Sequence, residues 1–195
     1  MTKEENFDPL QGMQIINATI HRAQNRLSEN GFLFIFWGWL VFAAALTFWV
    51  LVKQNVEEAW YIWMTMPLGG IFSMVYGFRQ KKKEKVRSYI DEYMAYIGIS
   101  FGISLTIVLS LGGKYQLMCY PTVILLYASF TFVTGGILKF KPLIIGGALS
   151  FPLCVIAMFF PFIDQVLFLA LSVLVSYIIP GHLLMSKYKK QNSNV

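Results

Sequence analysis

Six long runs of uncharged, mostly apolar residues follow one another along the chain, separated by short polar connections. They cover residues 31–52, 60–78, 93–113, 116–138, 142–163 and 165–185. A helix that rises about 1.5 Å per residue needs roughly 20 apolar residues to cross a hydrocarbon core about 30 Å thick. Lipid offers no hydrogen-bond partners, so such a segment must satisfy its own backbone as a helix. The pattern therefore predicts an all-α, polytopic membrane protein with six transmembrane helices.

A polar segment precedes the first run, and its apolar positions have a helical period. Asp8 can accept amide hydrogen bonds at a helix start, and Pro9 fits the first helical position. Apolar residues then recur at spacings of three and four, at Leu10, Met13, Ile16, Ile20, Ala23 and Leu27. We therefore expect residues 1–30 to form a cytoplasmic amphipathic helix. Three placements fit this helix: in the headgroup layer, as a cap below the bundle, or against the same helix of a second subunit in a homo-oligomer.

The charge distribution predicts how the six runs are oriented. Of the 16 lysines and arginines, Lys53 and Lys114 fall in connections on one face, and the other 14 fall on the opposite face. Because Lys and Arg concentrate in cytoplasmic loops, both termini are predicted to be cytoplasmic. Residues 31–186 then form a six-helix transmembrane domain, and residues 187–195 form a cytoplasmic tail.

Six of the basic residues are concentrated in RQKKKEKVR, residues 79–87, which we call the basic segment. They are Arg79, Lys81, Lys82, Lys83, Lys85 and Arg87. At a minimum the basic segment orients the neighbouring helices. Clusters of four to eight cations beside a membrane helix also attract anionic lipid, by roughly 1 kcal/mol per charge. These six residues are therefore predicted to bind membrane lipid or a cytoplasmic protein partner. Nucleic acid is not expected, because no aromatic-interleaved basic surface or recognition fold accompanies the segment.

The runs contain little of the chemistry that enzymes or proton-coupled transporters use. No Asp, Glu, Lys or Arg lies in the core of any run, whereas proton relays and charged-substrate pathways normally need such residues. The two histidines and two cysteines do not have metal-ligand spacing, and no catalytic motif is present. We therefore expect a non-enzymatic protein without a metal or cofactor. Whether Cys119 and Cys154 form a disulfide is left open.

Glycine and proline interrupt the second and fifth runs. Pro67 and Gly70 lie in the second run, and Gly147 and Pro152 lie in the fifth. Proline in a helix interior removes a hydrogen bond and causes a kink. These runs are the middle segments of two three-span halves, where broken helices mark the solute site in transporters built from inverted repeats. Together with His182, the ionisable group in the last run, these residues predict a path for an uncharged or apolar solute.

Two smaller motifs predict close packing. Gly98 and Gly102 form a GxxxG pair, for which packing within the monomer is the favoured interpretation. The sequence WGW, residues 37–39, lies a third of the way along the first run, where interfacial anchors are not expected, and indicates either a groove or dense packing. Trp49, Trp60 and Trp63 are expected to be interfacial anchors.

The stretches LSENGFLFIFWGWLVF, residues 27–42, and GGILKFKPLIIGG, residues 135–147, resemble small multi-spanning inner-membrane proteins of Bacteroidetes that carry no assigned activity. The resemblance implies a six-span protein of the bacterial inner membrane and a role in membrane-linked regulation. The first functional hypothesis is therefore a sensory, regulatory or scaffolding module that acts through its basic cytoplasmic face. The alternative is a transporter or channel for an uncharged or apolar solute.

Overall fold

The computed structural model describes residues 12–14, 31–81, 89–112 and 114–192, and every regular element within them is a helix. The elements are α2 (Gly31–Lys53), the 3₁₀ helix η1 (Glu57–Met64), α3 (Thr65–Lys81), α4 (Tyr89–Leu111), α5 (Gln116–Ile137), α6 (Lys141–Ala157), α7 (Phe162–Val173), the π-helical turn η2 (Leu174–Ile178) and α8 (Ile179–Asn192). Residues 12–14 are helical, and the rest of the predicted N-terminal helix lies outside the described residues.

Four helical stretches in the described part of the chain are long and apolar enough to cross a membrane. They are Phe32–Lys53, Glu92–Leu111, Met118–Ile137 and Phe162–Ser186. Each coincides with one of the predicted runs, which confirms an all-helical architecture with several apolar helices of membrane-spanning length. The other two runs form shorter helices, since α3 and α6 contain 17 residues each.

Prolines help to explain where the two shorter helices begin and end. Pro67 is the third residue of α3, in the first turn of its α-helical part. The tighter winding of η1 changes to an α-helix just before it. Pro161 is the N-cap of α7, and the turn it closes ends α6 at Ala157 rather than near residue 163. Pro152 lies inside α6 without ending the helix.

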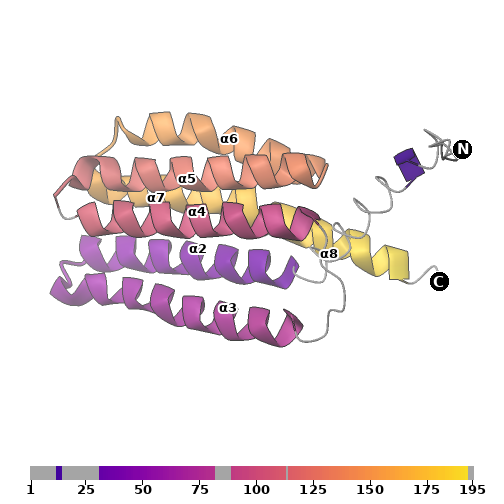
Figure 1. Cartoon of the computed structure of the whole chain (residues 1–195). Coiled ribbons are helices and arrows are strands. Elements are labelled where there is room, and N and C mark those ends of the chain that lie inside the picture. The colour runs from indigo at the N-terminus through magenta and orange to yellow at the C-terminus, as the bar shows by residue number, and fades with distance from the viewer. Residues whose placement is uncertain (1–11, 15–30, 82–88, 113, 193–195) are drawn as a thin grey trace, which may run out of the picture.

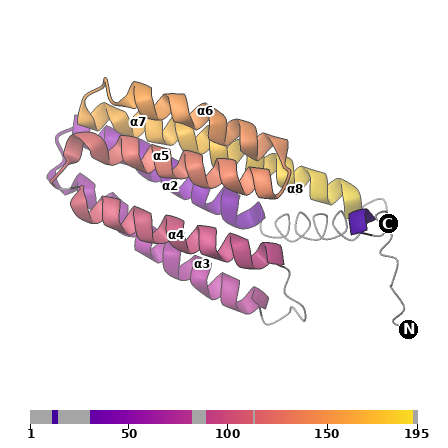
Figure 2. The same cartoon turned by 45° about the horizontal axis from the view of Figure 1, so that its top comes forward.

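The bundle has a central part and two peripheral helices (Figures 1 and 2). The central part consists of α2, α5, α6 and the continuous stretch from α7 to α8, which pack along one another. Among the described elements, α3 contacts only α2 and η1, and α4 contacts only α5. No side chain in the apolar stretch of α4 is buried, in contrast to half of those in the corresponding stretch of α5. Both peripheral helices are therefore held from one side.

Glycines set the closest backbone approaches in the central part. A Cβ atom placed on Gly147 would lie 2.6 Å from the backbone nitrogen of Phe132 in α5. One placed on Gly146 would lie 2.5 Å from the carbonyl oxygen of Val175 in η2. Because real Cβ atoms essentially never come within 3.0 Å of such neighbours, only glycine lets α6 pack this closely. Gly147, which was predicted to interrupt the fifth run, is therefore a contact point, and so is its neighbour Gly146.

The predicted packing of Gly98 and Gly102 within the monomer does not occur among the described residues. A Cβ atom at either position would meet nothing within 4 Å, and the same holds for Gly70 in α3. Gly98 and Gly102 thus face outward, since α4 meets α5 through a different side. Phe101 makes that contact, with its ring centroid 5.2 Å from that of Tyr127.

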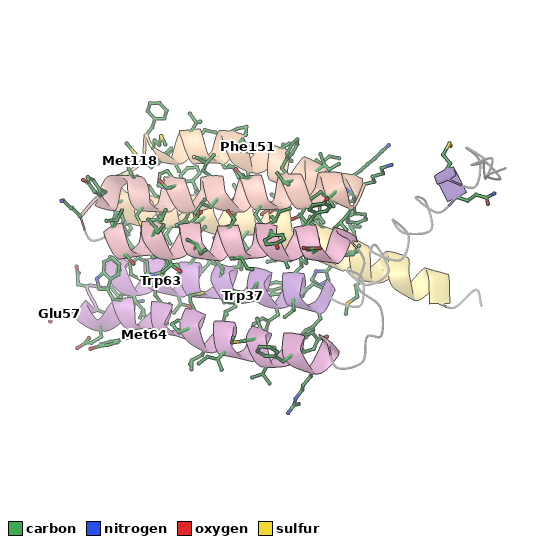
Figure 3. All side chains as sticks on the ribbon, in the orientation of Figure 1. Trp37, Glu57, Trp63, Met64, Met118 and Phe151 are labelled. Atoms are coloured by element: carbon green, nitrogen blue, oxygen red, sulfur yellow. The ribbon has the colours of Figure 1, made fainter. Side chains whose placement is uncertain are left out.

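Large apolar side chains also cover the outside of the bundle (Figure 3). Leu68 and Ile71 in α3 and Ile103 in α4 are all more than half exposed. In a water-soluble protein an apolar patch this extensive would be unusual, whereas lipid solvates such side chains at no cost. The exposed surface therefore agrees with a membrane location.

The connections between helices alternate between two ends of the bundle (Figure 1). The end that holds Lys139 and Lys141 also holds the C-terminal end of α3 and the N-terminal end of α4, and we call it the basic end. The opposite end holds Lys53 and Lys114, together with Glu57 (Figure 3). The predicted separation of basic residues is therefore visible in the described residues.

An ion pair fastens the end opposite the basic end. Asp164 Oδ1, in the first turn of α7, lies 3.2 Å from Lys53 Nζ and accepts a hydrogen bond from Trp49 Nε1 at 3.0 Å. Lys53 and Trp49 both belong to α2. The three side chains therefore join α2 to the start of α7.

Replacing Gly147 with alanine should destabilise the bundle by about 1–3 kcal/mol, because the added methyl group must push α5 and α6 apart. Unfolding by sodium dodecyl sulfate, followed by circular dichroism, would measure the loss. Gly70→Ala is the matched control, since its Cβ meets open space. Equal stability of the two variants would contradict the packing described here.

Candidate ligand-binding site

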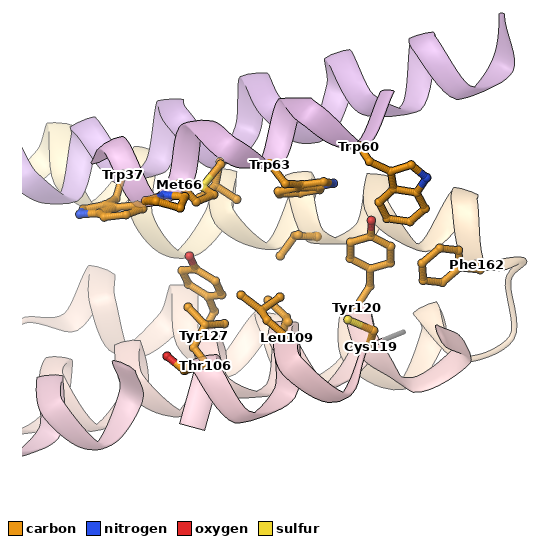
Figure 4. Close-up of a pocket in the computed structure, with 16 residues that line it drawn as sticks. Trp37, Trp60, Trp63, Met66, Thr106, Leu109, Cys119, Tyr120, Tyr127 and Phe162 are labelled. Atoms are coloured by element: carbon orange, nitrogen blue, oxygen red, sulfur yellow. The ribbon is translucent and has the colours of Figure 1, made fainter. Parts of the chain in front are cut away.

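A cavity of about 550 Å³ lies between the central part of the bundle and the peripheral helices (Figure 4). Residues of α2, η1, α3, α4, α5 and α7 contribute to its walls. Small-molecule sites typically measure about 300–1,000 Å³, so the cavity has the size of a ligand site.

Two facing walls of the cavity belong to α3 and α4, which do not contact each other. Met66 and Pro67 line the cavity from α3, and Leu105 and Leu109 line it from α4. In the second half of the chain, by contrast, α5, α6 and α7 all pack against one another. The cavity therefore lies in the first half of the chain, where α3 and α4 do not meet, and not in the second half, where α5, α6 and α7 close against one another.

Aromatic rings form most of the remaining wall. They are Trp37, Trp60, Trp63, Tyr120, Tyr127 and Phe162. Tyr120 packs with its ring centroid 5.0 Å from that of Phe162 and 6.1 Å from that of Trp63, so these rings hold one another in place. Trp37 is fixed differently, because its Nε1 donates a hydrogen bond to Ser73 Oγ of α3 at 2.9 Å. The aromatic wall is thus anchored to α2, η1 and α5.

Two phenol groups point into the cavity from one face of α5 (Figure 4). Tyr120 and Tyr127 are each 6% exposed, and they are two helical turns apart. The Tyr127 hydroxyl has no hydrogen-bond partner among the described residues. The Tyr120 hydroxyl faces the indole of Trp63, whose buried Nε1 makes no hydrogen bond of good geometry in the described part of the chain. Among the described residues, the Tyr127 hydroxyl and the Trp63 indole N–H are therefore unused hydrogen-bond donors inside an otherwise apolar cavity.

Among the described residues that line the cavity there is no Asp, Glu, Lys, Arg or His. The described residues also contain no cluster of three or more His, Cys, Asp or Glu side chains placed to hold a metal ion. The Thr106 hydroxyl donates to the Gly102 carbonyl oxygen at 2.8 Å, which uses its donor. The arrangement suits an uncharged molecule that is mostly apolar.

The structure does not bring together the five residues predicted to form a solute path. Pro67 lines the cavity, whereas Gly70 of the same helix faces open space. Gly147 is buried against α5, and Pro152 is exposed on α6. His182 is exposed on α8, and its Nδ1 lies 2.9 Å from the carbonyl oxygen of Ile178. α3 and α6 lie on opposite sides of the bundle (Figure 1), and of these two helices only α3 lines the cavity.

The basic segment begins at the C-terminal end of α3. Arg79 is exposed there, and Lys81 is the last residue of the helix. The other four predicted binding residues, Lys82, Lys83, Lys85 and Arg87, lie outside the described residues. The chain therefore passes from one cavity wall, through the basic segment, into the opposite wall.

Sequence patterns indicated only part of the aromatic wall. The WGW motif suggested a groove or dense packing, and both occur: Trp37 lines the cavity, whereas a Cβ on Gly38 would lie 2.7 Å from Ile178 Cγ1. Trp60 and Trp63, for which the sequence predicted an interfacial position, also line the cavity. The signal that was overlooked is Tyr120 and Tyr127, two phenols seven residues apart inside an apolar run.

No family model, curated protein or solved structure matches the chain.

The two cysteines differ in position and should differ in reactivity. Both are free thiols; Cys119 lines the cavity, whereas Cys154 is 4% exposed and its Sγ donates to the Pro121 carbonyl oxygen at 3.2 Å. We expect N-ethylmaleimide to alkylate Cys119 and to spare Cys154, as mass spectrometry would measure. Leu109→Trp, which fills the cavity from α4, should slow alkylation of Cys119 severalfold. An unchanged rate in that variant would mean that Cys119 is reached by another route.

Proposed function

We propose that this protein is a non-enzymatic, six-span protein of the bacterial inner membrane that binds a small uncharged, mostly apolar molecule and acts as a sensory or regulatory module. The observation that carries this proposal is the aromatic cavity between α3 and α4, two helices that do not touch and that are joined by the basic segment. A ligand in the cavity would contact both walls. Its presence would therefore change the separation of the helices that hold the two ends of the basic segment.

The six-span arrangement is supported by the way the helices lie side by side (Figure 2). α3 continues directly from η1, so that the helical path of residues 57–81 exceeds the length of a single span. α6 is apolar and spans the same part of the bundle as α5. With the basic end in the cytoplasm, as Lys and Arg distributions favour, the basic segment faces cytoplasmic partners and anionic headgroups.

A second function is favoured by the same cavity. An uncharged, apolar solute could pass along the α3 side of the bundle, where Pro67 and Met66 line the open space. Flux of an apolar solute into liposomes, reduced by Leu109→Trp, would favour transport over sensing. Binding without flux would favour the sensory role.

The binding step predicts that an uncharged apolar probe protects Cys119. Added to nanodiscs, 2,3-dimethylnaphthalene should slow alkylation of Cys119 by N-ethylmaleimide, and the effect should saturate because the cavity holds a limited volume. Leu109→Trp should remove the protection. A linear, non-saturating effect that persists in that variant would indicate partition into lipid alone and would contradict the proposal.

The basic segment predicts selective retention of anionic lipid. Lys81→Gln, Lys82→Gln and Lys83→Gln together should weaken that attraction by about 1 kcal/mol per charge removed. Quantifying the lipids that co-purify in mild detergent would measure the change. The control carries Lys139→Gln and Lys141→Gln, which remove charge at the same end of the bundle. If both variants retain the same lipids, a specific role for the basic segment would be ruled out.

A further inference from the structure

The polar groups inside the cavity narrow the chemistry of its ligand. We infer that the cavity takes a neutral, lipid-soluble molecule that carries at least one hydrogen-bond-accepting oxygen, such as a carbonyl compound, to which the Tyr127 hydroxyl donates. This inference rests on the proposed ligand-binding function and adds the requirement for an acceptor. It distinguishes such a molecule from a pure hydrocarbon of the same size.

The position of Tyr127 is the main support. Its ring is held between neighbours, with centroids 5.2 Å from Phe101 and 5.1 Å from Tyr177, so the phenol cannot turn away easily. Its hydroxyl points across the cavity toward Trp37 and Met66 (Figure 4). The Thr131 hydroxyl, one turn further along α5, behaves differently, because it donates to the Tyr127 carbonyl oxygen at 2.6 Å. Tyr127 thus keeps a donor that no described residue uses.

Tyr120 provides a second polar position further along the same wall. It lies seven residues before Tyr127, about 10 Å away along the helix axis. The buried indole nitrogen of Trp63 faces its hydroxyl without forming a well-oriented bond. A ligand oxygen near Tyr120 could therefore accept a hydrogen bond from the Tyr120 hydroxyl, and the indole N–H of Trp63 is a second donor close to that hydroxyl.

The apolar surroundings of the Tyr127 hydroxyl explain why an acceptor oxygen on the ligand contributes more to binding in the cavity than it would on a water-exposed surface. A hydroxyl in an apolar space loses its water partners, and leaving it unpaired is costly. A hydrocarbon would fill the volume and leave the Tyr127 donor unpaired, whereas a carbonyl oxygen would pair with it. A charged ligand is disfavoured, because no described residue with a charged side chain lines the cavity. Planar ligands gain further from stacking on Trp37, Trp63 and Tyr120.

Two probes of matched shape test this requirement. 2,3-Dimethyl-1,4-naphthoquinone carries two carbonyl oxygens, and its methyl groups block addition of the Cys119 thiol to the ring. 2,3-Dimethylnaphthalene has no acceptor oxygen. Each is titrated into nanodiscs, and the concentration that halves alkylation of Cys119 is measured. For each protein variant, the half-effect concentration of the quinone is divided by that of the hydrocarbon. Because each probe partitions into lipid to the same extent in every sample, differences in this ratio between variants report on the protein alone.

The variants are Tyr127→Phe, Tyr120→Phe and the double variant, which remove only the hydroxyl oxygens. Tyr61→Phe is the matched control, because Tyr61 is 69% exposed and does not line the cavity. The parent protein and the control should prefer the quinone after correction for partition. Tyr127→Phe should reduce that preference by about twofold to tenfold, the range of one hydrogen bond. The double variant should reduce it further. Protection by the hydrocarbon should stay the same in every variant, which shows that the cavity is intact.

The outcomes distinguish the requirement for an acceptor oxygen from ligand binding itself. If both probes protect Cys119 and the preference for the quinone is unchanged in the double variant, the inference is wrong and ligand binding stands. If neither probe protects Cys119 in the parent protein, the proposed binding function is wrong, and the inference is wrong with it. If Tyr61→Phe also lost the preference for the quinone, the inference would be overturned, because the preference would then not depend on a hydroxyl inside the cavity.

Discussion

Direct backbone contact between α6 and its two neighbours is the constraint on which the rest of the structure depends. In lipid, apolar surface alone does not drive helices together, and close packing supplies the attraction instead. Gly146 and Gly147 bring α6 against η2 and α5 at distances that no side chain would allow. The second half of the chain is therefore tightly closed. In the first half, α3 meets α2 through side chains, since a Cβ on Gly69 would lie 2.6 Å from the side-chain atom Leu40 Cδ2, and α3 and α4 make no contact.

The cavity follows from this difference. α3 is held to α2 by Gly69 and by the hydrogen bond from Trp37 to Ser73, and α4 is held to α5 through Phe101. Neither attachment closes the space between the two peripheral helices, and aromatic side chains from the central part line it. Helices with few buried side chains are also the ones that can move at the least cost. A pocket bounded by two such helices is well suited to convert the presence of a ligand into a change of position at the basic segment.

The sequence predicted the architecture better than the site. Run length and charge placement were enough to locate the apolar helices and to group Lys139 and Lys141 apart from Lys53, because lipid imposes strong and simple requirements on both. Helix partners were harder, since glycine is compatible with a kink, a contact or an exposed face. Gly147 was expected to interrupt a helix and instead permits a contact, whereas Gly98 was expected to pack within the monomer and meets open space. The cavity depends on which faces of six helices converge, and the period of a single run does not contain that information.

The most direct test of ligand-dependent coupling is the distance between the ends of α3 and α4. Spin labels at Phe78→Cys and Glu92→Cys flank the basic segment, on a background with Cys119→Ser and Cys154→Ser. Double electron–electron resonance in nanodiscs would give the distance distribution with and without 2,3-dimethyl-1,4-naphthoquinone. We expect the probe to shift or narrow the distribution, and Leu109→Trp to abolish its effect. A distribution that is identical with and without the probe, under conditions where the probe protects Cys119 in the parent protein, would contradict a coupling between the cavity and the basic segment.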